Sequence, residues 1–182
     1  MKLQKLSKNI FTKKNLIIFL TLIIGIFLFR SYKKITLYSF FIIITGIIVY
    51  YSKLYHIPFD VTPLFFLEIV ITRYFGLKYT LIYILLAYVL PKTMAGSGMN
   101  VISYAFITVS VVCNFLSLFM TGLGLQTVGY VTSIIQYVGG IFVSMTMVGK
   151  PFMFSALDGI ANVTNNLLWF LIFSDLIVFL FK

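Results

Sequence analysis

The chain is a succession of apolar runs that are interrupted by only a few polar residues. Hydrophobic residues make up 61% of its 182 residues and only 10% carry a charge, against roughly 25% in an ordinary soluble domain. A soluble core cannot hide so many apolar side chains behind so little polar surface. We therefore predict an integral membrane protein, and we expect neither a soluble enzyme nor a nucleic-acid-binding protein.

The positive charge of the chain is concentrated at its N-terminal end. Of the 14 Lys and Arg residues, eight lie within the first 34 positions, and the net charge of the whole chain is +10. Basic residues grouped beside apolar segments bind anionic membrane lipid. We expect residues 1–34 to form a basic, membrane-associated segment and residues 35–182 to form the membrane domain.

The N-terminal segment contains two different patterns. Residues 1–14 place their apolar side chains on one helical stripe, which is typical of a helix in the membrane interface, although a solvated tail is the alternative. Residues 16–29 form about 21 Å of apolar helix, which is short for a hydrocarbon core of about 30 Å. If they crossed the membrane, the basic residues 30, 33 and 34 would lie outside, against the positive-inside rule. An amphipathic or re-entrant segment therefore fits better than a seventh span.

Six further apolar runs predict an all-α, polytopic bundle of six transmembrane helices. The second and third runs flank Gly76 and would together make a helix of about 45 Å, which overshoots the bilayer, so we expect a hairpin there. With both termini in the cytoplasm, eleven basic residues lie inside the cell membrane, and Lys53, Lys92 and Lys150 lie outside. The six runs are residues 35–52, 61–75, 77–90, 100–121, 125–148 and 160–181.

Polar side chains collect at the ends of the spans that this topology places outside. The last span has four acid or amide residues at positions i, i+4, i+7 and i+8, which share one helical face. Amides suit hydrogen bonds between helices and equally suit a site for a small polar solute, so both interpretations stay open. The four residues are Asp158, Asn162, Asn165 and Asn166. In other spans, Asn100 and Tyr104 lie near the outer end and Gln136 lies at mid-depth.

Other ionisable residues lie outside this group. Glu68 is in the middle of a short span, and Arg73 is rotated from it by about 140°, which makes an ion pair between them unfavourable. We expect Glu68 to take a hydrogen-bond donor from another helix or to stay protonated. His56 and Asp60 lie in a connection that two prolines stiffen, so this loop is either a lid or a plain interfacial turn.

The sequence contains no pattern that indicates catalysis. The four acids are spread out and His56 is the only imidazole, so we expect no metal site and no cofactor. Ser155 and Asp158 lack a nearby base, which argues against a hydrolase. Cys113 has no partner for an intrachain disulfide.

The stretch IPFDVTPLFF at 57–66, followed by RYFGLKY at 73–79, resembles the substrate-binding S components of energy-coupling factor transporters. In that family a Pro-containing external loop leads into a short span, a Phe-Gly turn and another span, and the likeness covers residues 35–182. It implies uptake of a vitamin-like solute, with a transmembrane coupling subunit and two cytoplasmic ATPases as partners. It also implies eight solute contacts, namely His56, Asp60, Asn100, Tyr104, Gln136, Asn162, Asn165 and Asn166.

A second family gives an alternative hypothesis. The chain is similar to the D-type rod-shape-determining membrane proteins, which are also short and polytopic, with a glycine-broken hairpin and an asparagine in the last helix. These are non-catalytic scaffolds, and the likeness implies that Asn162 and Asn165 only join neighbouring helices. A cavity that can hold a solute separates the two hypotheses, because a scaffold should fill this region with side chains.

Overall fold

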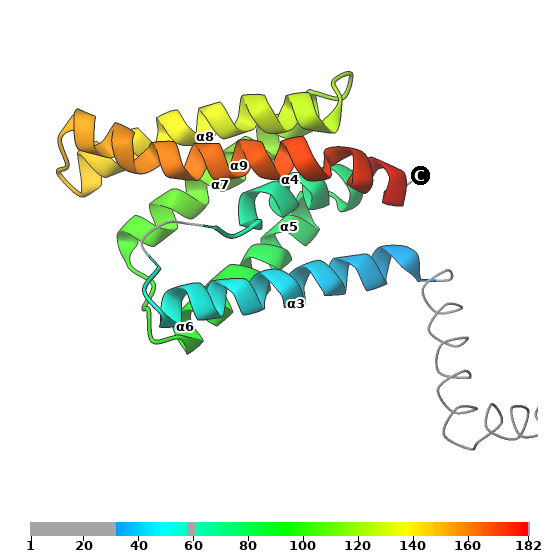
Figure 1. The fold of residues 1–182 in the computed structure, drawn as a ribbon, viewed down its shortest axis with the longest axis horizontal. Helices are drawn as coiled ribbons and strands as arrows, with labels where there is room; N and C mark the ends of the chain where they lie inside the picture. The colour runs from blue at the N-terminus through cyan, green and yellow to red at the C-terminus, as the bar shows by residue number, and fades with distance from the viewer. Residues whose placement is uncertain (1–31, 58–60, 182) are drawn as a thin grey trace, which may run out of the picture. The chain divides into compact units, whose positions relative to one another are not determined.

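The computed structural model describes residues 32–57 and 61–181, and every regular element within those ranges is a helix. Four described helices are long and apolar enough to cross a membrane, which confirms the expected class of helical membrane protein. They are α3 (Lys33–Leu54), α7 (Val101–Phe119), α8 (Leu125–Met147) and α9 (Phe152–Phe181), drawn in Figure 1. Most of the predicted segment 1–34 and the loop residue Asp60 lie outside the described residues.

The chain divides into two compact units, Met1–Phe40 and Phe41–Lys182. The described part of the first unit is the beginning of α3, which is a regular helix from Lys33 onward. The second unit contains the rest of α3 and all the other helices, and it also contains the site described below.

Shorter helices fill the middle of the chain. α4 (Leu64–Phe75) is followed by α5 (Leu77–Ile84), which continues through a π-helical turn, η1 (Leu85–Val89), into α6 (Leu90–Met94). The helical path from Leu77 to Met94 is therefore about 27 Å long. Pro91 explains the wider turn, because its ring has no N–H and would clash with a carbonyl of a regular α-turn before it.

The chain turns back on itself at Gly76. This glycine has a φ of 96°, in the left-handed region that favours glycine, and it separates α4 from α5. The hydroxyl oxygens of Thr72 and Thr80 lie 2.7 Å apart, although eight residues of straight helix would separate them by about 12 Å along the axis. The hairpin predicted at this glycine is therefore confirmed.

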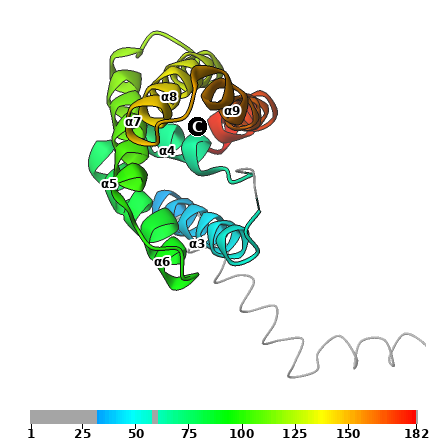
Figure 2. The same cartoon turned by 90° about the vertical axis from the view of Figure 1, so that its left-hand side faces the viewer.

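α4 is the central helix of the second unit. Its residues from Phe65 to Thr72 are all buried, and it contacts α5, α7, α8 and α9, as the end-on view in Figure 2 shows. Phe66 packs against three aromatic rings of α9, those of Trp169, Phe170 and Phe173. Such a helix, apolar on nearly every side, is stable only when it is covered all round.

Glycines let α8 approach its two neighbours closely. A Cβ atom added at Gly129 would lie 2.1 Å from Cδ1 of Phe170 on α9, and one at Gly139 would lie 2.6 Å from Cγ1 of Val109 on α7. Both distances are far below a van der Waals contact, so the packing at these points requires the absence of a side chain. Small residues at helix contacts are typical of membrane bundles.

Candidate functional site

A cavity of about 500 Å³ lies among the helices of the second unit. One end is lined by Lys150 and Asp158, whose side chains are exposed, and the other by the buried Glu68 and Ser133, so the cavity runs from the surface into the bundle. We call the surface end the mouth, lined by Lys53, Lys92, Asn100, Lys150 and Asp158. We call the inner end the floor, lined by Glu68, Ser110 and Ser133. Cavities of about 300–1,000 Å³ are typical of small-molecule sites.

The lengths of the helices and the small side chains of α8 account for the cavity. α4 is only about 18 Å long, whereas the neighbouring helices α7, α8 and α9 measure about 28 Å or more, so α4 cannot fill the space between them. The face of α8 that lines this space includes Gly140 and Ser144, whose side chains occupy little volume. The cavity is therefore a consequence of a short central helix beside a face of small residues.

At the floor, Glu68 is held by two donors from α7. Its side chain is 2% exposed, the hydroxyl of Ser110 donates to its Oε2 atom, and Nδ2 of Asn114 donates to the same oxygen at 2.8 Å. The expectation that Glu68 takes a donor from another helix is confirmed. Because α7 fixes the carboxyl group in this position, Glu68 presents an acidic group to the inner end of the cavity.

Ser133 of α8 also lines the floor, and its hydroxyl has no hydrogen-bond partner within the part of the chain that the structure describes. The residue is 1% exposed. A buried polar group without a partner costs about 1–3 kcal/mol. A guest molecule that hydrogen-bonds this hydroxyl would remove that cost, so Ser133 is a natural contact for a bound solute.

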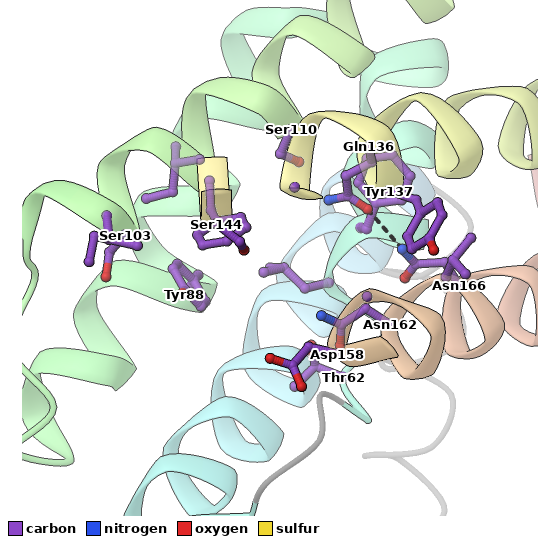
Figure 3. A pocket seen from close by; sticks show the side chains of 18 of the residues that line it. Thr62, Tyr88, Ser103, Ser110, Gln136, Tyr137, Ser144, Asp158, Asn162 and Asn166 are labelled. Atoms are coloured by element: carbon purple, nitrogen blue, oxygen red, sulfur yellow. Dashed lines mark hydrogen bonds between the residues drawn. The ribbon is translucent and has the colours of Figure 1, made fainter. Parts of the chain in front are cut away.

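Two amides form the wall of the cavity on α8 and α9. Nδ2 of Asn166 donates to Oε1 of Gln136 at 2.8 Å, the bond drawn as a dashed line in Figure 3. Asn162 lines the cavity one turn before Asn166 on α9. Since an amide has two donor hydrogens and an acceptor oxygen with two lone pairs, this single bond leaves Gln136 and Asn166 able to bind further groups.

At the mouth, Lys92 is anchored by α7. Its Nζ atom donates to the hydroxyl of Ser103 at 2.7 Å and lies 5.5 Å from the centre of the Tyr88 ring. Asn100 caps α7 by accepting from the backbone N–H of Ser103 at 2.8 Å. Burial, and secondly the nearby positive charge of Lys53, hold the pKa of Lys92 below its ordinary value. The ammonium group is thus fixed in place rather than free in solvent.

The other charges of the mouth are one ion pair and one lysine. Nζ of Lys150 lies 2.6 Å from Oδ2 of Asp158, and because both side chains are exposed the pair contributes only about 0–1 kcal/mol. Among the described residues, no carboxylate lies within salt-bridge distance of Lys53 or Lys92. The mouth therefore has a net positive charge.

The structure brings together four of the eight residues that the resemblance singled out. The four that line the cavity are Asn100, Gln136, Asn162 and Asn166. Asn100 lies at the start of α7, Gln136 on α8, and Asn162 and Asn166 on α9. Part of the predicted polar cluster therefore lies around one cavity.

The other four residues do not line the cavity or lie outside the described ranges. Tyr104 is 56% exposed, because it is rotated by about 100° from Ser103, which faces the cavity. Asn165 is likewise rotated by about 100° from Asn166, which lines the cavity, and its Nδ2 atom donates to the carbonyl of Thr62 at 3.1 Å. His56 is exposed in the turn after α3, with a φ of 51°, and Asp60 falls in the range that is not described.

Several lining residues were not singled out from the sequence. Ser110 and Ser133 are hydroxyl residues inside apolar runs, and such residues often bond only to their own helix. A signal was present in α7, where Ser103, Ser110, Asn114 and Ser117 follow a spacing of seven, four and three residues. This spacing places all four on one face, and all four are buried in the structure.

No protein-family model matches the chain, and neither a curated protein nor a solved structure matches it. The interpretation of the cavity therefore depends on its own residues and geometry. These define a helical membrane protein with a polar, positively charged opening that leads to a buried acidic floor.

Proposed function

We propose that this protein binds a small polar solute inside the membrane and serves its uptake, in the way of an S component of an energy-coupling factor transporter. The observation that carries the proposal is the cavity of about 500 Å³, whose lining combines amides, hydroxyls and charged groups from several helices. A volume of this size with a few convergent polar groups suits a small molecule. The unpartnered hydroxyl of Ser133 supports a guest at the floor.

The proposed topology has six spans in the cell membrane, with the hairpin of α4 and α5 counted as two and both termini in the cytoplasm. Lys53, Lys92 and Lys150, the three basic residues that this topology puts outside, all line the mouth. Arg73 belongs to the opposite end, where its guanidinium donates to the carbonyls of Met120 and Leu123 after α7. The cavity then opens away from the cytoplasm, as solute capture requires.

Under this proposal the protein works with others. A transmembrane coupling subunit and two cytoplasmic ATPases would supply the energy for uptake, and membrane lipid would surround the exposed apolar faces of the long helices. The alternative, a non-catalytic scaffold, needs side chains to fill the region between α7, α8 and α9. The cavity favours solute binding over that alternative.

The proposal is tested by purifying the full chain in mild detergent and identifying small molecules that co-purify with it by mass spectrometry. Ser144→Leu should remove the solute, because this residue lines the cavity and the added volume occupies it. Thr146→Leu is the matched control, since Thr146 is exposed on the same helix. A wild-type protein without any solute, or a solute that Ser144→Leu leaves in place, would contradict solute binding.

A further inference from the structure

Two serines of α7 give the distance between the mouth and the floor of the cavity. Ser103 contacts the ammonium group of Lys92 at the mouth, and Ser110 contacts the carboxyl group of Glu68 at the floor. The two serines are seven residues apart, which is two helical turns, so they share a face and are separated by about 10 Å along the axis. A fixed cation and an acidic group therefore lie at opposite ends of the same cavity.

The mouth suits an anionic group. Lys92 and Lys53 are close enough for the charge of one to act on the other, and no described carboxylate lies within salt-bridge distance of either. The N-terminal end of α7, which begins at Val101, adds the positive end of a helix dipole next to Ser103. A carboxylate or phosphate at this place would be attracted by all of these groups.

The floor suits a group that donates hydrogen bonds and carries a positive charge. Two neutral groups, the hydroxyl of Ser110 and the amide of Asn114, donate to Oε2 of Glu68. A buried carboxylate is stabilised most by a cation that is itself hydrogen-bonded. The free hydroxyl of Ser133 lies at the same end and can accept from an ammonium group.

We propose that the solute is dipolar, with an anionic group bound at Lys92 and Lys53 and an amine bound at Glu68. This inference rests on the proposed solute-binding function and names the chemical class of the solute. The separation of its two groups lies between about 5 and 10 Å, because a hydrogen bond of about 2.8 Å at each end shortens the span if the groups are in line. The α-amino and α-carboxylate groups of an amino acid such as glycine are too close together to reach both ends.

The test uses four probes that differ by one feature. 6-Aminohexanoate has both charges on a five-methylene chain, hexanoate lacks the amine, hexylamine lacks the acid, and glycine has both charges side by side. Binding to the purified full chain is measured as a rise in Tm, followed by the fluorescence of Trp169, the only tryptophan. We expect 6-aminohexanoate to bind about tenfold more tightly than the other three.

Two charge-removing variants assign the ends. Lys92→Gln should weaken the binding of 6-aminohexanoate by about tenfold and leave the binding of hexylamine unchanged. Glu68→Gln should also weaken the binding of 6-aminohexanoate by about tenfold, but it should leave the binding of hexanoate unchanged. Lys78→Gln removes an exposed lysine near Gly76 and is the matched control. If Glu68→Gln does not fold, Lys53→Gln and the probe series on the wild type still test the proposal. Equal binding of hexanoate and 6-aminohexanoate, or no effect of Lys92→Gln, would overturn it.

A zwitterionic lipid headgroup has the same pair of charges, so the source of the ligand is tested separately. In vesicles of phosphatidylglycerol, 6-aminohexanoate should still raise Tm. If phosphatidylethanolamine alone raises Tm as much and the probe adds nothing, the ligand is a lipid and the proposal of a soluble dipolar solute fails. If no probe binds while the wild type retains a co-purified solute, this proposal fails and solute binding stands. If no probe binds and no solute co-purifies, both the dipolar-solute proposal and the proposed solute binding fail.

Discussion

Thr72 of α4 donates its hydroxyl hydrogen to Oδ1 of Asn114 on α7 at 2.9 Å. The Nδ2 atom of the same asparagine donates to Glu68, one turn earlier on α4. Because Thr72 has a single hydroxyl hydrogen, its 2.7 Å contact with Thr80 requires Thr80 to be the donor. This buried network joins α4, α5 and α7, and it fixes the rotation of α4 that turns Glu68 towards the cavity.

Replacing Asn114 by Leu, which has a similar shape, should destabilise the fold strongly. The change removes the partner of Thr72 and one of the donors to Glu68, and we expect a loss of about 2–4 kcal/mol. Ser117→Ala is the control, because the Ser117 hydroxyl donates to the Asn114 carbonyl of its own helix at 2.7 Å, and no other described residue bonds to it. The measurement is unfolding of the purified protein in a denaturing detergent. Equal effects of the two changes would show that the network contributes little.

Alanine at two adjacent glycines of α8 should have opposite effects on stability. Gly140→Ala should stabilise by about 0.5–1 kcal/mol, because its Cβ would meet nothing closer than Cε1 of Phe106 at 3.5 Å and alanine favours the helix. Gly139→Ala should destabilise by about 1–3 kcal/mol, because its Cβ would lie 2.6 Å from Val109, a stiff β-branched side chain. Unfolding of the two variants in a denaturing detergent measures both effects. Two changes of the same sign would contradict the packing of α8 against α7.

The parts of the structure that follow from local rules were predictable from the sequence. The hairpin at Gly76 followed from the length of its two runs, and the interhelix donor to Glu68 followed from the cost of a buried acid. The sequence did not tell whether Asn165 or Asn166 faces the cavity. Both belong to the same broad face of α9, and the packing around α4 decides which amide faces the cavity.

The cavity itself could not be predicted, because it depends on packing between distant parts of the chain. The 3.6-residue period tells which residues share a face but not which neighbour that face meets. Ser110 could therefore be assigned to a polar face of its span, whereas its contact with Glu68, 42 residues away in the sequence, required the arrangement of α4 beside α7.

The pKa of Lys92 predicts a pH dependence of solute binding. Burial and the charge of Lys53 lower this pKa from 10.5, so the folded protein loses the proton at a lower pH than the unfolded chain does. Affinity for the anionic end of 6-aminohexanoate should therefore fall as pH rises through the lowered pKa, while the stability of the solute-free protein rises between the two pKa values. Titrating the affinity from neutral to alkaline pH measures the effect.

Lys53→Gln should move the alkaline loss of affinity to higher pH, because it removes one of the two causes that lower the pKa of Lys92. The amine of the probe titrates alike in both proteins, so the difference between them reports on Lys92. Lys92→Arg should keep its affinity at alkaline pH, since a guanidinium stays protonated. An unchanged midpoint in Lys53→Gln would mean that the two lysines do not interact at the mouth.

Labelling of single cysteines should place the mouth outside the cell. Cys113 is fully buried, so the wild-type protein should give little background with a membrane-impermeant thiol reagent. Met94→Cys, near the mouth and 69% exposed, should react in intact cells.

Tyr32→Cys, 57% exposed before α3, should react only after the membrane is opened, because the six-span topology keeps the basic N-terminal region inside. Lys78→Cys, just after the turn at Gly76, should behave like Tyr32→Cys. If Tyr32→Cys reacts in intact cells, residues 16–29 cross the bilayer, and a protein of seven spans replaces the proposed six.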